Sequence, residues 1–329
     1  MPARKTATSA SRSKRSRAPS PDVRKAIARG KSRAREVLVA RAALHAKRAK
    51  AVTVVSRTLK RGVVPAISAR TLAALGPAAT AGLLIAEGDS WFDYPLHDVL
   101  KMLEDEHGFD VESVAHKGDR VEDMAFSPGQ LDEFSRRLEK VLRGGVVPRA
   151  ILLSGGGNDL AGAEFGMLLN HAASPIAGLN DDVVTGVIDK RIKTAYVAIV
   201  AAITAICQKY LNRPIPIVTH GYAHPVPDGR GFLGGFLFLP GPWLEPGFRE
   251  KGFDDLARNT AIMETLLNRF NAMLQSAAAE FDHVHYVDLR QTLRNDNRYR
   301  TYWANELHPT TAGFTMVAEK LASVIAGLP

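Results

Sequence analysis

Ser90 stands directly after an apolar run at residues 82–87 and two residues after Gly88. The apolar run is typical of a buried parallel strand, and the glycine predicts a sharp turn where that strand ends. Open α/β sheets bind their ligands at the carboxyl ends of such strands. A serine hydroxyl attacks an acyl carbon only when a base takes its proton. Ser90 alone therefore fits a helix-capping residue as well as a nucleophile.

Three other polar residues have the chemistry that a nucleophilic serine needs. His308 precedes the last predicted helix, and its imidazole can accept the proton of an attacking hydroxyl. Gly118 follows the second predicted strand, and its amide can approach an oxyanion closely because glycine has no side chain. Asn158 follows the third predicted strand and offers a neutral carboxamide donor. These residue types predict acyl transfer by a serine.

The segments that hold these residues resemble, in chain order, the four blocks of the SGNH (GDSL-type) hydrolase family: Gly88-Asp89-Ser90, Gly118, Gly156-Gly157-Asn158-Asp159 and His308-Pro309. The resemblance covers residues 82–329. It implies a serine esterase or lipase with a flavodoxin-like sheet in strand order 2-1-3-4-5, and hydrolysis without a metal or cofactor. It also implies that Ser90 is the nucleophile and His308 the base. The amides of Ser90 and Gly118 and the side chain of Asn158 would form the oxyanion hole.

The sequence departs from the family at the position three residues before the histidine, which the family usually fills with Asp. Here that position is Asn305, and Glu306 follows it. Asn305 can orient an imidazole but cannot offset the charge of an imidazolium, whereas Glu306 can if it points inward. Either the site is a Ser-His pair helped by a neutral group or a backbone carbonyl, or another acid replaces the missing Asp, and Glu306 is the nearest carboxylate. Between Asn305 and Glu306 we favour Asn305 as the neighbour of His308, and we expect Glu306 to face solvent.

Strand and helix patterns alternate along residues 81–329. Apolar runs predict five strands, at residues 82–87, 109–114, 150–154, 215–219 and 284–289. Helical patterns fall near residues 96–106, 131–142, 188–210, 254–281 and 310–326. Strands that alternate with helices form a parallel sheet covered on both faces. We therefore expect an α/β fold of three α/β/α layers with a five-stranded parallel sheet, preceded by a basic N-terminal extension.

Composition separates this extension from the rest of the chain. Residues 1–70 carry 20 of the 43 Lys and Arg residues but two of the 34 Asp and Glu residues. We expect a basic, disordered arm at residues 1–50, a linker or docking segment at 51–80 and a hydrolase domain at 81–329. The arm suits a polyanionic partner, either nucleic acid or an anionic lipid surface. We favour a solvated tail, or one that binds such anions loosely, and an organellar transit peptide is the alternative.

Other features limit where the protein acts. Cys207 is the single cysteine, which excludes an internal disulfide. No apolar stretch reaches the roughly 18 residues of a membrane span, and none follows the basic N-terminus as in a secretory signal. We expect a cytoplasmic protein, and the sequence leaves its oligomeric state open.

Residues 225–252, after the fourth strand, are rich in Gly, Pro and aromatic residues. Such an insertion is typical of a lid, or of a surface loop packed on its own aromatic side chains. We expect Trp91, His220 and Tyr222 to line the substrate site. The aromatic residues favour esters with an apolar acyl group, such as a fatty acyl or aryl ester. A carbohydrate O-deacetylase and a catalytically weak binding protein tethered by its arm remain the alternatives.

Overall fold

The computed structural model describes residues 46, 47, 50, 80–127, 129–234 and 239–329. The predicted arm at residues 1–50 and the linker at 51–80 thus lie almost entirely outside the described residues, as do residues 235–238 of the insertion.

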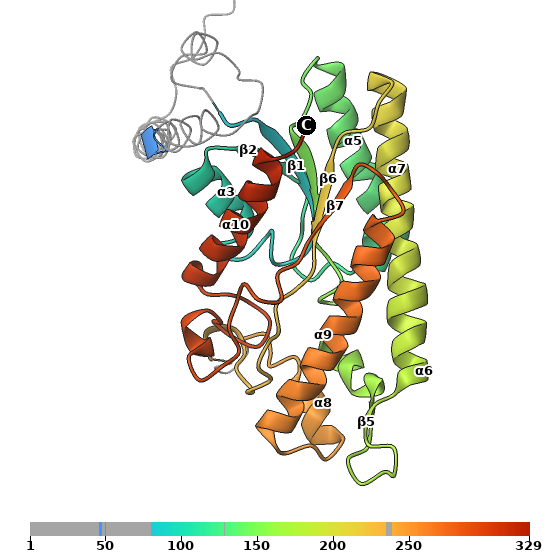
Figure 1. Ribbon diagram of the computed structural model, residues 1–329, viewed down its shortest axis with the longest axis vertical. Helices are drawn as coiled ribbons and strands as arrows, with labels where there is room; N and C mark the ends of the chain where they lie inside the picture. The colour runs from blue at the N-terminus through green and yellow to red at the C-terminus, as the bar shows by residue number, and fades with distance from the viewer. Residues whose placement is uncertain (1–45, 48–49, 51–79, 128, 235–238) are drawn as a thin grey trace, which may run out of the picture. The chain divides into compact units, whose positions relative to one another are not determined.

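A five-stranded parallel sheet forms the centre of the described chain (Figure 1). Its strand order is β2-β1-β3-β6-β7, which is the predicted order 2-1-3-4-5. β3 is apolar along its whole length and β1 is apolar up to its last residue, Glu87, as expected for strands covered on both faces. The strands are β1 (Leu83–Glu87), β2 (Asp110–Ser113), β3 (Ala150–Leu153), β6 (Ile217–His220) and β7 (Val284–Val287).

Helices cover both faces of this sheet, and the predicted three-layer α/β/α fold is confirmed (Figure 1). On one face α3 (Val99–His107) packs against α10 (Thr311–Ala326). On the other face α7 (Lys193–Leu211) packs against three further helices, which are α4 (Val121–Phe126), α5 (Gln130–Arg143) and α9 (Leu256–Ala278). Two short helical segments, α6 (Asp181–Val184) and η3 (Thr185–Ile192), lead directly into α7.

Capping side chains explain where the helices begin. The predicted helix at 96–106 starts only at Val99, because Leu96 has a positive φ of 74° and the Asp98 side chain accepts a hydrogen bond from the Lys101 amide. The helix predicted from residue 188 starts earlier, because Asn180 caps it by accepting from the Val183 amide at 3.1 Å. Thr310 caps α10 by accepting from the Gly313 amide at 3.2 Å, two residues after His308.

Several short elements lie outside the predicted pattern. A second sheet pairs β4 (Leu169–Asn170) with β5 (Gly178–Leu179) in antiparallel fashion, after the 3-10 segment η2 (Gly162–Leu168). The insertion contains η4 (Phe232–Gly234) and α8 (Glu245–Glu250), and η5 (Tyr299–Thr301) precedes the histidine loop. These elements are too short to leave a period in the sequence.

One helical stretch among the described residues, Asp181–Leu211, is long and apolar enough by length and composition to cross a membrane. The expectation that no stretch reaches this length is therefore wrong. The core helix of a globular domain passes the same test. Here Ile199 and Ile203 are buried, and the Tyr196 hydroxyl donates to the Gly155 carbonyl at 2.8 Å. These contacts favour a core helix that supports the loop after β3.

Candidate active site

The turn after β1 holds Ser90 by way of its neighbour Asp89. One carboxylate oxygen of Asp89 accepts from the Trp91 amide at 3.0 Å and from the Ser154 hydroxyl at 3.0 Å. The other oxygen accepts from the Tyr222 hydroxyl at 2.5 Å. At Gly88 an added Cβ would lie 2.8 Å from the Ser154 carbonyl, so the turn requires glycine. Ser90 is thereby fixed at the carboxyl end of β1.

His308 lies next to this serine. Its Nε2 is 2.8 Å from the Ser90 hydroxyl, and its Nδ1 is 3.0 Å from Oδ1 of Asn305. The backbone amides of Leu307 and His308 donate to the same Oδ1, at 3.0 and 2.9 Å. These two amides require an acceptor, so they fix the Asn305 carboxamide with its oxygen toward the ring. Nδ1 is then the donor, which leaves Nε2 free to accept the serine proton.

Two aromatic residues enclose the imidazole. The Tyr94 ring stacks on it with centroids 4.3 Å apart, and Trp243 approaches with a ring centroid 5.4 Å away. The Asn305 Nδ2 donates to the Tyr94 hydroxyl at 3.1 Å, which supports the same carboxamide orientation. Burial lowers the pKa of His308 to about 3. The imidazole is therefore neutral near pH 7 and able to act as a base.

The predicted oxyanion donors lie on loops that are bonded to one another. The Asn158 Nδ2 donates to the Asp119 carbonyl at 2.9 Å, which uses one of its two hydrogens. Gly118 precedes Asp119 and has a φ of +91°, a conformation that favours glycine. The His116 amide donates to the Gly88 carbonyl at 3.0 Å, so this loop is also bonded to the turn of Ser90.

The pattern of the GDSL-like lipase/acylhydrolase family matches residues 74–315. The chain belongs to this family. No curated protein matches the chain. One similar solved structure is a protein from Slackia heliotrinireducens described as an SGNH hydrolase, with 15% identity, 74% of this chain and 98% of that chain covered, and a TM-score of 0.45. Another is a catalytic mutant of an acetylxylan esterase from Geobacillus stearothermophilus, which is 14% identical. The match covers 76% of this chain and 96% of that chain, with a TM-score of 0.40. At these values the likenesses carry no argument about substrate.

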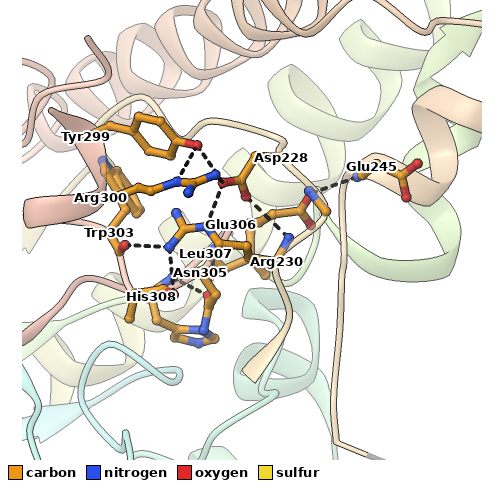
Figure 2. Close-up of polar contacts among 12 residues, drawn as sticks. Asp228, Arg230, Glu245, Tyr299, Arg300, Trp303, Asn305, Glu306, Leu307 and His308 are labelled. Atoms are coloured by element: carbon orange, nitrogen blue, oxygen red, sulfur yellow. Dashed lines mark hydrogen bonds and ion pairs between the residues drawn. The ribbon is translucent and has the colours of Figure 1, made fainter. Parts of the chain in front are cut away.

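Glu306 does not contact the histidine of this GDSL-like site. Its side chain is fully buried, and its carboxylate accepts four hydrogen bonds from backbone amides of the insertion (Figure 2). The pKa of Glu306 is raised above its ordinary value, because the effect of burial outweighs that of the four amides, which lower it. Its prediction as a third catalytic residue is thus corrected, and so is the expectation that it faces solvent. The amides draw the side chain away from the ring.

A small cavity opens beside Ser90 and Asn158, with a volume of about 50 Å³. Trp91 and Tyr222 line it, as the sequence predicted for substrate-binding residues. His220 does not line it, because its side chain is fully buried and stacks on Trp91 with centroids 5.6 Å apart. The prediction that His220 contacts substrate is therefore wrong. The other apolar lining residues are Leu160, Ala161, Ala223, Pro225, Leu244, Met263, Leu267, Trp303 and Leu307.

Tyr94 and Trp243 were not predicted as neighbours of His308. Neither residue belongs to a family block, and each reaches the imidazole from a loop whose path depends on the tertiary fold. The Trp91 indole was predicted only as a pocket wall. It also donates to the Leu307 carbonyl at 3.0 Å and so joins the serine turn to the histidine loop. Across residues 80–127, 129–234 and 239–329, no group of three or more His, Cys, Asp or Glu residues is placed to hold a metal ion.

Proposed function

We propose that this chain hydrolyses carboxylic esters with a short apolar acyl group, through Ser90 and His308. The observation that carries the proposal is the 2.8 Å contact between the Ser90 hydroxyl and Nε2 of a neutral His308, at the edge of an apolar cavity. A nucleophile bonded to a base that a third group orients is the arrangement used for acyl transfer. Membership of an acylhydrolase family supports the same reaction class.

The reaction proceeds in two halves. The Ser90 oxygen attacks the ester carbonyl carbon while its proton passes to Nε2 of His308. The amides of Ser90 and Gly118 and the Asn158 side chain stabilise the resulting oxyanion. The alcohol leaves with the proton from His308, and an acyl-serine remains. Water then attacks this acyl group with His308 as base, which releases the acid and restores the serine.

Asn305 orients His308 without supplying a charge. Replacing a triad aspartate by asparagine is harmful where it imposes the wrong imidazole tautomer. In this chain the amides of Leu307 and His308 hold Oδ1 toward Nδ1, so the tautomer is the productive one. Asn305 therefore acts as the third member of a neutral triad.

The cavity volume favours a short acyl group over a fatty acyl chain. A water-sized group needs roughly 10–15 Å³ of such volume, so about 50 Å³ admits roughly three to five heavy atoms. Acetyl and propionyl groups fit this limit. The apolar lining suits their methyl ends.

A carbohydrate O-deacetylase is a second candidate, and one observation favours it. A larger cavity of about 610 Å³ is also lined by residues of α9. The same helix contributes Met263 and Leu267 to the small apolar cavity, and Glu264 and Asn268 to the large one. The other residues that line the large cavity are mostly polar: His224, Asp288, Arg290, Gln291, Leu293, Arg294, Asn295 and Asp296. Such a groove suits a polyhydroxylated alcohol.

A p-nitrophenyl ester series from acetate to decanoate tests the proposal, with Ser90→Ala as control and acetylated xylo-oligosaccharides as a second substrate. We expect the highest kcat/KM with acetate or propionate. Ser90→Ala should lose activity by a factor on the order of 10⁴ or more. A folded wild-type protein that hydrolyses none of these esters would refute the proposal and favour the tethered binding protein. Selective turnover of the acetylated sugars would favour the deacetylase.

A further inference from the structure

We propose that Glu306 is a positioning residue that anchors the insertion over His308 and so sets the size of the acyl cavity. The part about substrate size rests on the proposed function, and the anchoring itself does not. The residues it anchors are Gly229, Trp243, Leu244 and Glu245 of the insertion, and Leu244 forms part of the wall of the cavity.

Each oxygen of the Glu306 carboxylate accepts hydrogen bonds from two backbone amides. Oε1 accepts from the amides of Gly229 and Glu245, both at 3.0 Å. Oε2 accepts from the amides of Trp243 and Leu244, at 2.7 and 2.8 Å. Residues near both ends of the insertion are thus held by one side chain (Figure 2). Hydrogen bonds to an ionised acceptor are stronger than neutral ones, so the carboxylate is well suited to this role.

The amides that Glu306 binds have few other acceptors. Leu244 and Glu245 stand at the beginning of α8, where helix amides have no partner within the helix. A buried carboxylate likewise requires donors, since an unpaired buried charge is costly. Each side therefore satisfies the other, and the arrangement is specific to a side chain with two acceptor oxygens.

A second set of bonds joins the same insertion to the histidine loop. The Arg230 guanidinium donates to the carbonyls of Trp303 and Ala304, both at 3.0 Å. The Arg230 carbonyl accepts from the Glu306 amide at 3.2 Å. Asp228 accepts from the Tyr299 hydroxyl at 2.6 Å and pairs with Arg230 at 2.5 Å (Figure 2). The insertion and the loop of His308 thus form one bonded unit.

Two of the anchored residues contact the reaction site. Trp243 lies against the His308 ring, and Leu244 lines the acyl cavity beside Glu306 and Leu307. Leu244 is 1% exposed, so it forms part of a packed wall. Releasing the Trp243 and Leu244 amides would free this wall to move outward. The cavity would then accept longer acyl groups.

Glu306→Gln tests this directly, because glutamine has the same shape but one acceptor oxygen in place of two. Two of the four amides would then face an NH₂ donor. The control is Glu250→Gln, which alters an exposed carboxylate at the end of α8 in the same insertion and does not line the cavity. Hydrogen exchange of the backbone amides and kcat/KM over the ester series are measured for both variants and the wild type.

In the wild type we expect slow exchange at the amides of Gly229, Trp243, Leu244 and Glu245. In Glu306→Gln we expect at least two of them to exchange tenfold faster or more, with no such change in Glu250→Gln. The ratio of kcat/KM for acetate over hexanoate should fall about tenfold, since discrimination by one methylene in a tight pocket is of that order. A general structural defect would lower both rates and leave this ratio unchanged.

Fast wild-type exchange at these amides would overturn the anchor even if the variant failed to fold. An unchanged acetate-to-hexanoate ratio in a folded Glu306→Gln would overturn the control of cavity size. If the wild type hydrolyses no ester while the exchange pattern is as expected, the proposed function fails and the anchor stands.

Discussion

Asn305→Asp supplies the carboxylate that the family usually has, at a site already shaped to hold it. Aspartate has the same shape as asparagine, and the Leu307 and His308 amides would still donate to Oδ1. The Tyr94 hydroxyl, which now accepts from Nδ2 at 3.1 Å, can rotate and donate to the new oxygen. We therefore expect the substitution to leave the fold intact and to place a negative charge beside Nδ1.

The size of the effect follows from the 3.0 Å separation of Oδ1 and Nδ1. Two unit charges at this distance attract by roughly 5 kcal/mol at an effective dielectric constant of about 20. The burial of a new carboxylate offsets part of this, and an adjacent opposite charge typically shifts a pKa by about 1–3 units. The pKa of His308 should rise by this amount from about 3. Since the imidazolium forms during the attack, we expect kcat/KM at pH 8 to rise about tenfold.

The assay is kcat/KM for p-nitrophenyl acetate from pH 4 to 9. Activity is lost as pH falls through the pKa of the base, so wild-type activity should persist well below pH 6.5. As the pH is lowered, the variant should lose its activity at a higher pH than the wild type does. Asn297→Asp adds the same charge at an exposed position and serves as control. A folded Asn305→Asp with an unchanged acid limb, or with lower activity at pH 8, would refute the neutral triad.

Three other outcomes are expected. Asn158→Ala should lower kcat by about 10²–10³ with a smaller change in KM, because its amide binds the developing oxyanion; a pure KM effect would contradict this. Glu87→Gln should stabilise the protein at pH 8 but not at pH 4. Burial raises the pKa of Glu87 to about 8, so the folded state retains a proton that the unfolded state releases near pH 4.5. The stability of the wild type therefore falls by up to about 1.4 kcal/mol per pH unit as the pH rises from about 4.5 to about 8. Thermal unfolding at both pH values checks this, and an equal difference at both would contradict it. Removal of residues 1–50 should abolish salt-sensitive binding to DNA or anionic vesicles while ester hydrolysis persists, and binding that survives the removal would exclude the arm.

Much of the site could be predicted because it depends on the sheet. Ser90, Gly118 and Asn158 each follow a strand, and the carboxyl ends of parallel strands meet at one edge. An apolar run followed by glycine therefore places each residue in space almost independently of the loops. His308 is placed in the same way by the start of α10, which Thr310 caps.

The orientation of Glu306 could not be predicted, because it depends on residues that are distant in the chain. Its nearness to His308 in the sequence suggests a catalytic carboxylate, yet four amides of the insertion decide where it points. The prediction that His220 contacts substrate was wrong for a similar reason. It ends β6 at the correct edge of the sheet, but Trp91 stacks on it and separates it from the cavity.

The neutral triad and the buried carboxylate are consistent with each other. A charge on Glu306 is stabilised by main-chain amides and lies on the side of the loop away from the imidazole, while Oδ1 of Asn305 is held by two amides of the same loop. The loop can therefore carry an acid at one position without perturbing the base at another. His308, enclosed by Tyr94 and Trp243, then stays neutral down to low pH. We therefore expect such a site to suit esters with a good leaving group, which departs with little help from a stabilised imidazolium, rather than amides.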